Sequence, residues 1–414
     1  MKIVLIRPPF ISGWKGSPLG LAYLNGVLKK HGHDSIAIDL NLEINNTIEI
    51  LPQYTRDFTI PDDHPAIDYT YKRLDQYCEM VLASEPEIVG FSLGYPTVEY
   101  GIAMAKILSK HVRCIAGGPQ ATYNEEDLLS IGCFDTVVSG YGEEAILEAL
   151  NSKGIIQKPL VPKKEYLPDY TGIEIDKYNG ELSVVTTRGC PYKCHFCTQH
   201  LPYYFHSIDT VVNQIKNTPN ATGIMYNDSS ININNNRTAK LFEEISTLDT
   251  KPPGHIFGMQ IHEGYKNYVS KMASAGVREA RVGIESGSMR ERNSMNKPKF
   301  DNDLIVEFVK ELTKYKILTL AQYIICYPDE TEEDRMETFA LMNRINSECD
   351  SEYVKHWWFQ FVVHHGGEKL FKEKYGVVKD SPKTWRNSTY TPDIINKTIE
   401  RFTKIVPENA TVHS

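Results

Sequence analysis

The chain has 414 residues, a formal net charge of −8, 41% hydrophobic residues and 24% charged residues, a composition typical of soluble globular proteins. This length predicts two or three domains. The acidic balance and the absence of a dense Lys/Arg run argue against a nucleic-acid binder. The first apolar run, Ile3 to Ile6, is too short for a signal peptide, and no run approaches the ~18 residues of a spanning helix. We therefore expect a cytoplasmic protein without a membrane or nucleic-acid partner.

Residues 1–152 alternate short apolar strands with amphipathic helices. Five β-runs begin at Lys2, Asp34, Pro86, Arg113 and Phe134, and helical patterns separate them. This alternation predicts an α/β domain with a doubly wound, Rossmann-like parallel sheet. Right-handed crossovers bring the carboxyl ends of its strands to one edge, where ligands bind in sheets of this kind.

Glycines follow several of these strands. They are Gly94, Gly117, Gly118, Gly140 and Gly142. Glycine at a strand end allows a positive φ or a close approach of the backbone to a ligand, although any single one could simply form a tight turn. No GxGxxG motif follows the first strand, so the sequence argues against a nicotinamide dinucleotide site.

Residues 153–178 interrupt the alternation with prolines and lysines and are expected to be a linker. Six more strand signals then alternate with helices over residues 179–365. They lie at 182–187, 223–227, 255–262, 279–285, 318–325 and 354–363. This pattern predicts a partial (β/α)6 barrel, because a complete barrel would need about two more units. Residues 366–414 are expected to form a small C-terminal region.

Three cysteines lie in the stretch TTRGCPYKCHFC, which opens the second half. Cys190, Cys194 and Cys197 have the spacing Cys-x3-Cys-x2-Cys. Three thiolates in one loop can hold three irons of a 4Fe-4S cluster and leave the fourth iron open to a ligand. Zinc is the weaker alternative, because only His195 and His200 lie nearby and no second ligand pair follows. Three structural cysteines remain a further alternative.

Polar side chains recur on one face of the expected barrel strands. Period-two alternation groups Gly258, Gln260 and His262 in one strand, Arg281, Gly283 and Glu285 in the next, and His356, Trp358 and Gln360 in another. Buried polar groups need partners. A ligand inside the barrel would supply them, whereas the alternative is that these strands are partly exposed edges.

The cysteine motif, preceded by a Rossmann-like half, resembles the radical S-adenosylmethionine (SAM) family, and in particular its branch with an N-terminal cobalamin-binding domain. The resemblance implies a 4Fe-4S cluster on the three cysteines, SAM on the open iron, and cobalamin. Tyr226, Asn227 and Asp228 end a strand where the family binds the methionine amino group. Cys326 replaces a usual glycine and is expected to pack. The residues expected beside SAM are Phe196, Tyr226, Asn227, Gln260, Arg281, Glu285, Ser286 and Cys326.

The segments GFSLGYPT, GGPQAT and SGYGEEA resemble the cobalamin-contacting loops of this branch. The implied contacts are Ser92, Leu93, Tyr95, Gly117, Gly118, Pro119, Gly140, Tyr141, Gly142 and Glu143. Mutase-type cobalamin domains carry Asp-x-His-x-x-Gly after the first strand, but RPPFISG follows that strand here and has no His. We therefore expect base-off cobalamin without His ligation, with the segment from Leu93 to Tyr95 beneath the cobalt.

The function implied by the resemblance is methyl transfer to a poorly activated carbon. A second hypothesis keeps both cofactors but catalyses an oxidation, cyclisation, rearrangement or transfer of another SAM-derived group. A third is a non-enzymatic corrinoid and iron–sulfur electron carrier. The expected partners are a small-molecule or peptide substrate and an external electron donor such as flavodoxin or ferredoxin, with the chain as a monomer. His364 and His365 are candidate substrate contacts, and no catalytic residue is assigned.

Overall fold

The computed structural model describes residues 1–9, 16–42, 65–94, 97–158, 164–178, 180–197, 202–218, 220–363, 367–380 and 384–413. Two compact units make up the chain. Unit 1 comprises Met1–Ser183 and Asn213–Thr222, and unit 2 comprises Val184–Val212 and Gly223–Ser414. The predicted site residues Tyr95, His364 and His365 lie outside the described residues. Among the described residues, no helix has the length and apolar character needed to cross a membrane.

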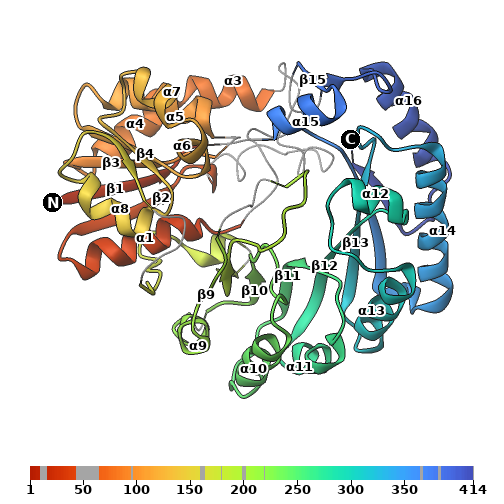
Figure 1. Ribbon diagram of the computed structural model, residues 1–414. Helices are drawn as coiled ribbons and strands as arrows, with labels where there is room; N and C mark the ends of the chain where they lie inside the picture. The colour runs from red at the N-terminus through yellow and green to blue at the C-terminus, as the bar shows by residue number, and fades with distance from the viewer. Residues whose placement is uncertain are drawn as a thin grey trace. The chain divides into compact units, whose positions relative to one another are not determined.

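A six-stranded sheet in the order β2-β1-β3-β4-β5-β6 forms the centre of unit 1 (Figure 1). Every neighbouring pair is parallel, which confirms the predicted Rossmann-like sheet. The strands are β1 (Lys2–Arg7), β2 (Asp34–Asp39), β3 (Ile88–Ser92), β4 (Arg113–Gly117), β5 (Thr136–Ser139) and β6 (Gly154–Gln157). The last of these is an extra strand, because it begins in the stretch expected to be a linker.

Helices cover both faces of this sheet. The helices are α1 (Leu19–Lys30), α3 (Pro65–Lys72), α4 (Leu74–Leu82), α5 (Val98–Leu108), α6 (Pro119–Tyr123), α7 (Glu125–Ser130) and α8 (Gly142–Ala149). Leu5 packs in the apolar cluster of α1 and α8, and its neighbour Val4 packs in the cluster of α4 and α5. Because both faces are buried, the strands are apolar at consecutive positions.

The expected linker packs into unit 1. Tyr178, in the short helix η2 (Ile175–Tyr178), is fully buried, and its hydroxyl donates to Asp39 Oδ2 over 2.5 Å. Arg7 Nε donates to the other oxygen of Asp39 over 2.8 Å. Asn25 Nδ2 donates to Asp169 Oδ1 over 3.1 Å. The prolines and lysines therefore mark an irregular path along the domain rather than a separate connector.

A seven-stranded sheet in the order β17-β14-β13-β12-β11-β10-β7 forms the centre of unit 2. Six of its strands match the six predicted ones. The strands are β7 (Glu181–Val184), β10 (Gly223–Tyr226), β11 (Gly254–Met259), β12 (Val277–Glu285), β13 (Leu318–Ile325), β14 (Val354–Gln360) and β17 (Ala410–His413). The seventh strand, β17, pairs in parallel with β14. Strand β17, within the expected small C-terminal region, therefore extends the barrel sheet.

Helices cover the outer face of this curved sheet (Figure 1). They include α10 (Asn235–Ser246), α11 (Val269–Ser274), α13 (Asn302–Lys314) and α14 (Glu332–Glu348). Side chains cap three of them: Asn234 accepts from Arg237 N, Asp301 accepts from Leu304 N, and Thr331 with Asp334 forms a capping box. The remaining elements are α9 (Ile208–Lys216), α12 (Met289–Ser294), α15 (Glu368–Tyr375), α16 (Pro392–Thr403), η3 (Tyr265–Asn267), η4 (Ser351–Tyr353) and the pairs β8 (Thr187–Arg188) with β9 (Tyr204–Phe205) and β15 (Val378–Lys379) with β16 (Trp385–Arg386).

His356 does not belong to the inner polar face. Its ring nitrogens lie 3.0 Å from the Tyr323 hydroxyl and 3.0 Å from Asn346 Oδ1, a residue of α14 on the outer side. Burial lowers the pKa of His356 to about 4, so the ring is neutral. Strand β11 also departs from strict alternation, because its register shifts between Ile256 and Met259. The expected polar face of β14 therefore lies on the outer side of the sheet, and strict alternation fails in β11.

Candidate active site

The three motif cysteines line one cavity of about 610 Å³ in unit 2. None of the three cysteines forms a disulfide, and Cys194 is buried. Among the described residues, no group of His, Cys, Asp and Glu is close enough to enclose a single metal ion. A cluster fits this spacing better, because each thiolate then binds a separate iron. Burial raises the pKa of the Cys194 thiol to about 12, while the nearby Lys297 lowers it.

The cysteine loop packs against the end of α12. His195 N donates to Met295 O over 2.9 Å, and Asn296 Nδ2 donates to Lys193 O over 2.7 Å. Lys374 of α15 reaches the same place, with its Nζ 3.1 Å from Ser294 O. The loop is thus held at the end of α12 by one backbone hydrogen bond and by side-chain contacts.

A buried ion pair forms one wall of this cavity. Lys297 Nζ lies 2.8 Å from Glu285 Oε1, and both side chains are almost fully buried. The ammonium also lies 5.9 Å from the centre of the Phe196 ring. Burial opposes a charge on Lys297, but Glu285 and Cys194 raise its pKa above the ordinary value. Sequence analysis identified Glu285 and missed Lys297, because a single lysine between two helices forms no pattern.

Asp228 also lines the cavity. Its Oδ1 accepts hydrogen bonds from Thr186 N and Oγ1, each over 3.0 Å, and from Thr187 Oγ1 over 2.7 Å. Its buried Oδ2 has no hydrogen-bond partner among the described residues. Burial raises the pKa of Asp228 to about 6 although these hydrogen bonds lower it. Asp228 therefore anchors the strand that leads into Cys190 and keeps one oxygen for another donor.

The structure brings some of the expected SAM contacts together and separates others. Phe196, Asn227, Gln260 and Glu285 line the cavity. The other four pack elsewhere in unit 2. Tyr226 packs edge-on against Phe242, Arg281 lies over the rings of Phe257 and Trp357, Ser286 bonds to Thr338, and Cys326 is buried with φ +61° and its N–H bonded to Glu330. The positive φ of Cys326 agrees with its position at a usual glycine.

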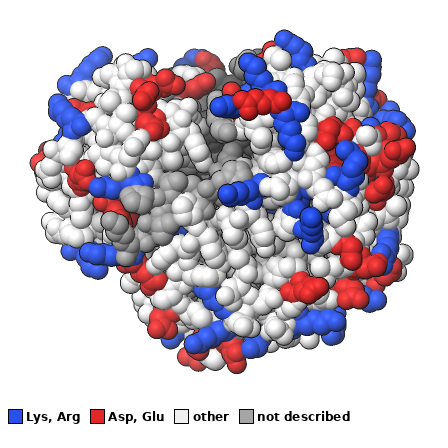
Figure 2. All heavy atoms as spheres, in the orientation of Figure 1, with Lys and Arg blue, Asp and Glu red and all other residues white. Residues whose placement is uncertain are grey.

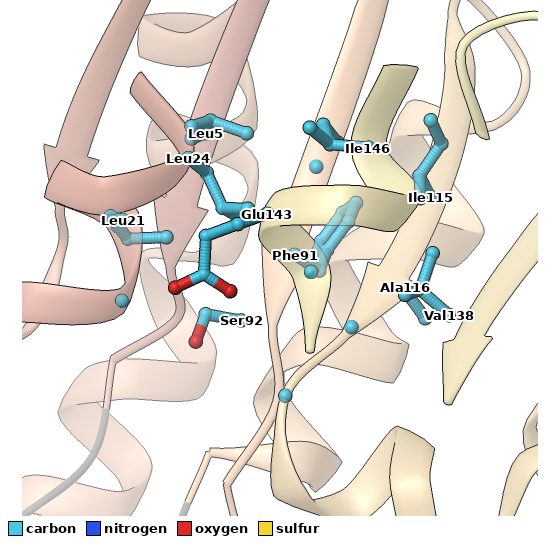
Figure 3. Close-up of a pocket in the computed structure, with 15 residues that line it drawn as sticks. Leu5, Leu21, Leu24, Phe91, Ser92, Ile115, Ala116, Val138, Glu143 and Ile146 are labelled. Carbon is cyan, nitrogen blue, oxygen red and sulfur yellow. The ribbon is translucent and has the colours of Figure 1, made fainter. Parts of the chain in front are cut away.

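A second, smaller cavity lies at the carboxyl edge of the unit 1 sheet. It measures about 100 Å³, and its lining includes Ser92, Gly117, Gly118, Gly142 and Glu143 of the expected cobalamin contacts (Figure 3). A Cβ on Gly118, which has φ +93°, would lie 2.8 Å from Leu93 O. Leu93 itself is buried, and Pro119, Gly140 and Tyr141 are not among the lining residues. The glycines thus keep space open where a larger residue would fill it.

Two family models match the chain. Residues 12–150 match the B12 binding domain, and residues 184–342 match the Radical SAM superfamily. The chain is a radical SAM protein with a B12-binding domain. The cofactors of these domains are a 4Fe-4S cluster, SAM and cobalamin. The thiols of the larger cavity suit a cluster in their chemistry, and the glycine-lined cavity can take only a small part of cobalamin.

Several known proteins resemble this radical SAM protein along most of its length. The Pyrococcus horikoshii protein named "Uncharacterized methyltransferase PH0819" is 25% identical over 97% of this chain and 89% of its own. The anaerobic magnesium-protoporphyrin IX monomethyl ester cyclase of Rubrivivax gelatinosus is 22% identical, over 91% and 73%. The solved structure of the methyltransferase TsrM from Kitasatospora setae, with cobalamin and a 4Fe-4S cluster, has a TM-score of 0.69 at 14% identity, over 95% and 80%.

Proposed function

We propose that this protein is a cobalamin-dependent radical SAM methyltransferase that acts on a poorly activated carbon. The observation that carries the proposal is the presence, in one chain, of a thiol cavity with a buried ion pair and a glycine-lined cavity at a parallel-sheet edge. The methyltransferase name of the Pyrococcus horikoshii relative, similar over nearly the whole chain, supports the same activity.

Bound together, the three cofactors supply one-electron cleavage of SAM, hydrogen abstraction and a methyl group. The chain's own residues hold and orient them. Cys190, Cys194 and Cys197 would bind three irons. The Lys297 ammonium would attract the carboxylate of SAM, and Asp228 Oδ2 would accept from its ammonium group. The Glu285 carboxylate balances the charge of Lys297 and so stabilises the buried ammonium group before SAM binds.

Apolar side chains complete the cavity and exclude water from a reactive radical. Phe196, Phe257 and Met259 contribute ring and thioether surface between the polar groups. Excluding water prevents side reactions and strengthens the ionic contacts in the cavity. His364 and His365 remain our candidates for substrate contact, and a small molecule or peptide is the expected substrate class.

The partners and the setting of the reaction follow from the same chemistry. Cluster reduction requires a one-electron donor, for which flavodoxin or ferredoxin is suited, and we expect the chain to act as a monomer. None of the eight cysteines forms a disulfide, which suits a reducing, cytoplasmic compartment. On the face that Figure 2 shows, acidic and basic side chains are interspersed, unlike the basic stripe of a nucleic-acid binder.

A second candidate function keeps the cofactors but transfers no methyl group. The relative from Rubrivivax gelatinosus is named as a cyclase, and it is similar over 91% of this chain. Cyclisation or another oxidation would use the same SAM cavity but convert the substrate to a different product. Cobalamin would then assist a radical step instead of donating a methyl group.

Product analysis separates the two functions. The reconstituted protein is incubated anaerobically with SAM, hydroxocobalamin, a reductant and candidate substrates. Formation of both 5′-deoxyadenosine and S-adenosylhomocysteine supports methyl transfer, whereas 5′-deoxyadenosine alone supports the second candidate. If the cluster- and cobalamin-loaded protein forms neither product with any substrate, a corrinoid and iron–sulfur electron carrier becomes the better description.

A further inference from the structure

The unit 1 cavity is apolar except at one end. Leu5, Leu21, Leu24, Phe91, Ile115, Ala116, Val138 and Ile146 supply most of its side chains. Ser92 and Glu143 are the two polar side chains among its described lining residues. In Figure 3 the Glu143 carboxylate points toward the Ser92 end, while Ile115, Val138 and Ile146 lie at the other side. One edge of a ligand can therefore meet polar atoms, and the rest meets hydrocarbon.

The cavity volume identifies the part of cobalamin that enters. A space of about 100 Å³ is far too small for a corrin ring. An apolar cavity of ~150 Å³ accepts a benzene ring, so a space of this scale suits one flat base after small movements of its walls. The lower base of the nucleotide tail is the flat, apolar part of the cofactor. A base held there cannot also bind cobalt, which agrees with the expected base-off cobalamin.

We propose that this cavity selects cobamides by their lower base, accepting benzimidazole or phenolic bases and disfavouring purines. A purine carries ring nitrogens on both of its rings, and an adenine adds an amine. Ser92 and Glu143 can meet one edge only, so the remaining nitrogens would face Ile115, Val138 and Ile146 without partners. Each buried unpaired polar atom costs at least about tenfold in affinity, which equals about 1.4 kcal/mol.

Two features of the cavity wall strengthen this selection. Gly142, at the start of α8, has no side chain, and an added Cβ would lie 3.0 Å from Leu24 Cδ2, so glycine leaves this part of the wall to the hydrocarbon of Leu24. Val138, Ile146 and Leu5 belong to the apolar core cluster beneath the cavity, and that cluster resists movement. Small movements of these walls can admit a flat base, but they bring no polar partner to the outer nitrogens of a purine.

Equilibrium binding tests the proposal without any turnover. The full-length protein is titrated anaerobically with cobalamin, with an adeninyl cobamide, with a phenolyl cobamide and with cobinamide, which lacks the nucleotide. Absorbance changes of the corrin give each Kd. We expect cobalamin and the phenolyl form to bind at least tenfold more tightly than the adeninyl form, and cobinamide to bind more weakly than cobalamin.

A matched pair of variants assigns the selection to the cavity. Val138→Thr adds a hydroxyl to the lining, and Val137→Thr makes the same change in the core cluster on the other face of the sheet. Val138→Thr should reduce the preference for cobalamin over the adeninyl cobamide several-fold, and Val137→Thr should leave this preference unchanged. A preference below tenfold in the unaltered protein would overturn the proposal, as would cobinamide binding equal to that of cobalamin. If no cobamide binds, the cofactor site itself is wrong and the selection with it, whatever the reaction proves to be.

Discussion

The two cavities of this chain hold their ligands by opposite means. The unit 2 cavity combines three thiols with a buried Lys–Glu pair and a carboxylate, whereas the unit 1 cavity consists of glycine backbone and hydrocarbon. In the first, charge and metal ligation determine what binds. In the unit 1 cavity, shape and the absence of polar partners determine what binds. Substitutions should therefore act on the two sites through different physical quantities.

The largest expected effect is loss of the cluster. Cys194→Ala removes one of three iron ligands, and two thiolates cannot retain a 4Fe-4S cluster. Iron and sulfide content should fall to background after anaerobic reconstitution, while corrinoid binding in unit 1 stays unchanged. Cys78, Cys114, Cys133 and Cys349 serve as controls, because none of them lines the cavity. Loss of iron in one of those four variants, with the fold retained, would contradict the ligand assignment.

The next largest effect concerns the buried ion pair. Lys297→Met should weaken SAM binding about 100-fold, because it removes the buried cation that we propose for the SAM carboxylate. It should also destabilise the protein by about 3–5 kcal/mol, since Glu285 is left charged and unpaired. Calorimetric titration with SAM and urea unfolding measure the two effects.

The double variant Lys297→Met/Glu285→Gln separates these effects. It should recover most of the stability, because no uncompensated charge remains, but it should not recover SAM affinity. Lys299→Met is the matched control, since Lys299 is exposed and does not line the cavity. Normal SAM affinity in Lys297→Met would show that this lysine only neutralises Glu285.

The glycine-lined cavity should respond to size instead of charge. Gly118→Ala places a methyl group 2.8 Å from Leu93 O at a residue with φ +93°, so the loop must shift. We expect at least a tenfold loss of cobalamin affinity and unchanged iron content. Gly132→Ala is the control, because Gly132 has φ +79° but an added Cβ would meet nothing within 4 Å. If Gly118→Ala and Gly132→Ala bind cobalamin with equal affinity, the strain of alanine at a positive φ would explain the result. The close approach of the added methyl group to Leu93 O would then not explain it.

Local signals made the fold and the cluster loop predictable, and non-local contacts limited the rest. Apolar runs and three cysteines in eight residues can be recognised without knowing their surroundings. By contrast, β17 has the short sequence ATVH, and only its pairing with the distant β14 makes it a strand. Lys297 reaches Glu285 because α12 turns the chain back. Tyr178 is buried through Asp39, which lies 139 residues earlier.

The smallest expected effect contrasts the two faces of the unit 2 sheet. His356 lies on the outer face, and burial lowers its pKa to about 4, below the ordinary 6.5. The folded protein therefore favours the neutral ring. This contribution to stability is fully present above pH 6.5 and is lost progressively as the pH falls toward 4.

Urea unfolding at pH 7.5 and 5.5 measures this loss. Between these values the unaltered protein should lose about 1 kcal/mol more unfolding free energy than His356→Gln, because only histidine takes up a proton on unfolding. The glutamine can still bond to Tyr323 or Asn346, so the variant should fold. His262→Gln is the comparison, since no buried histidine is removed there. If the unfolding free energies of the unaltered protein and of His356→Gln depend equally on pH, His356 is in contact with solvent. The polar side chains of β14 would then need to be reassigned to the inner face of the sheet.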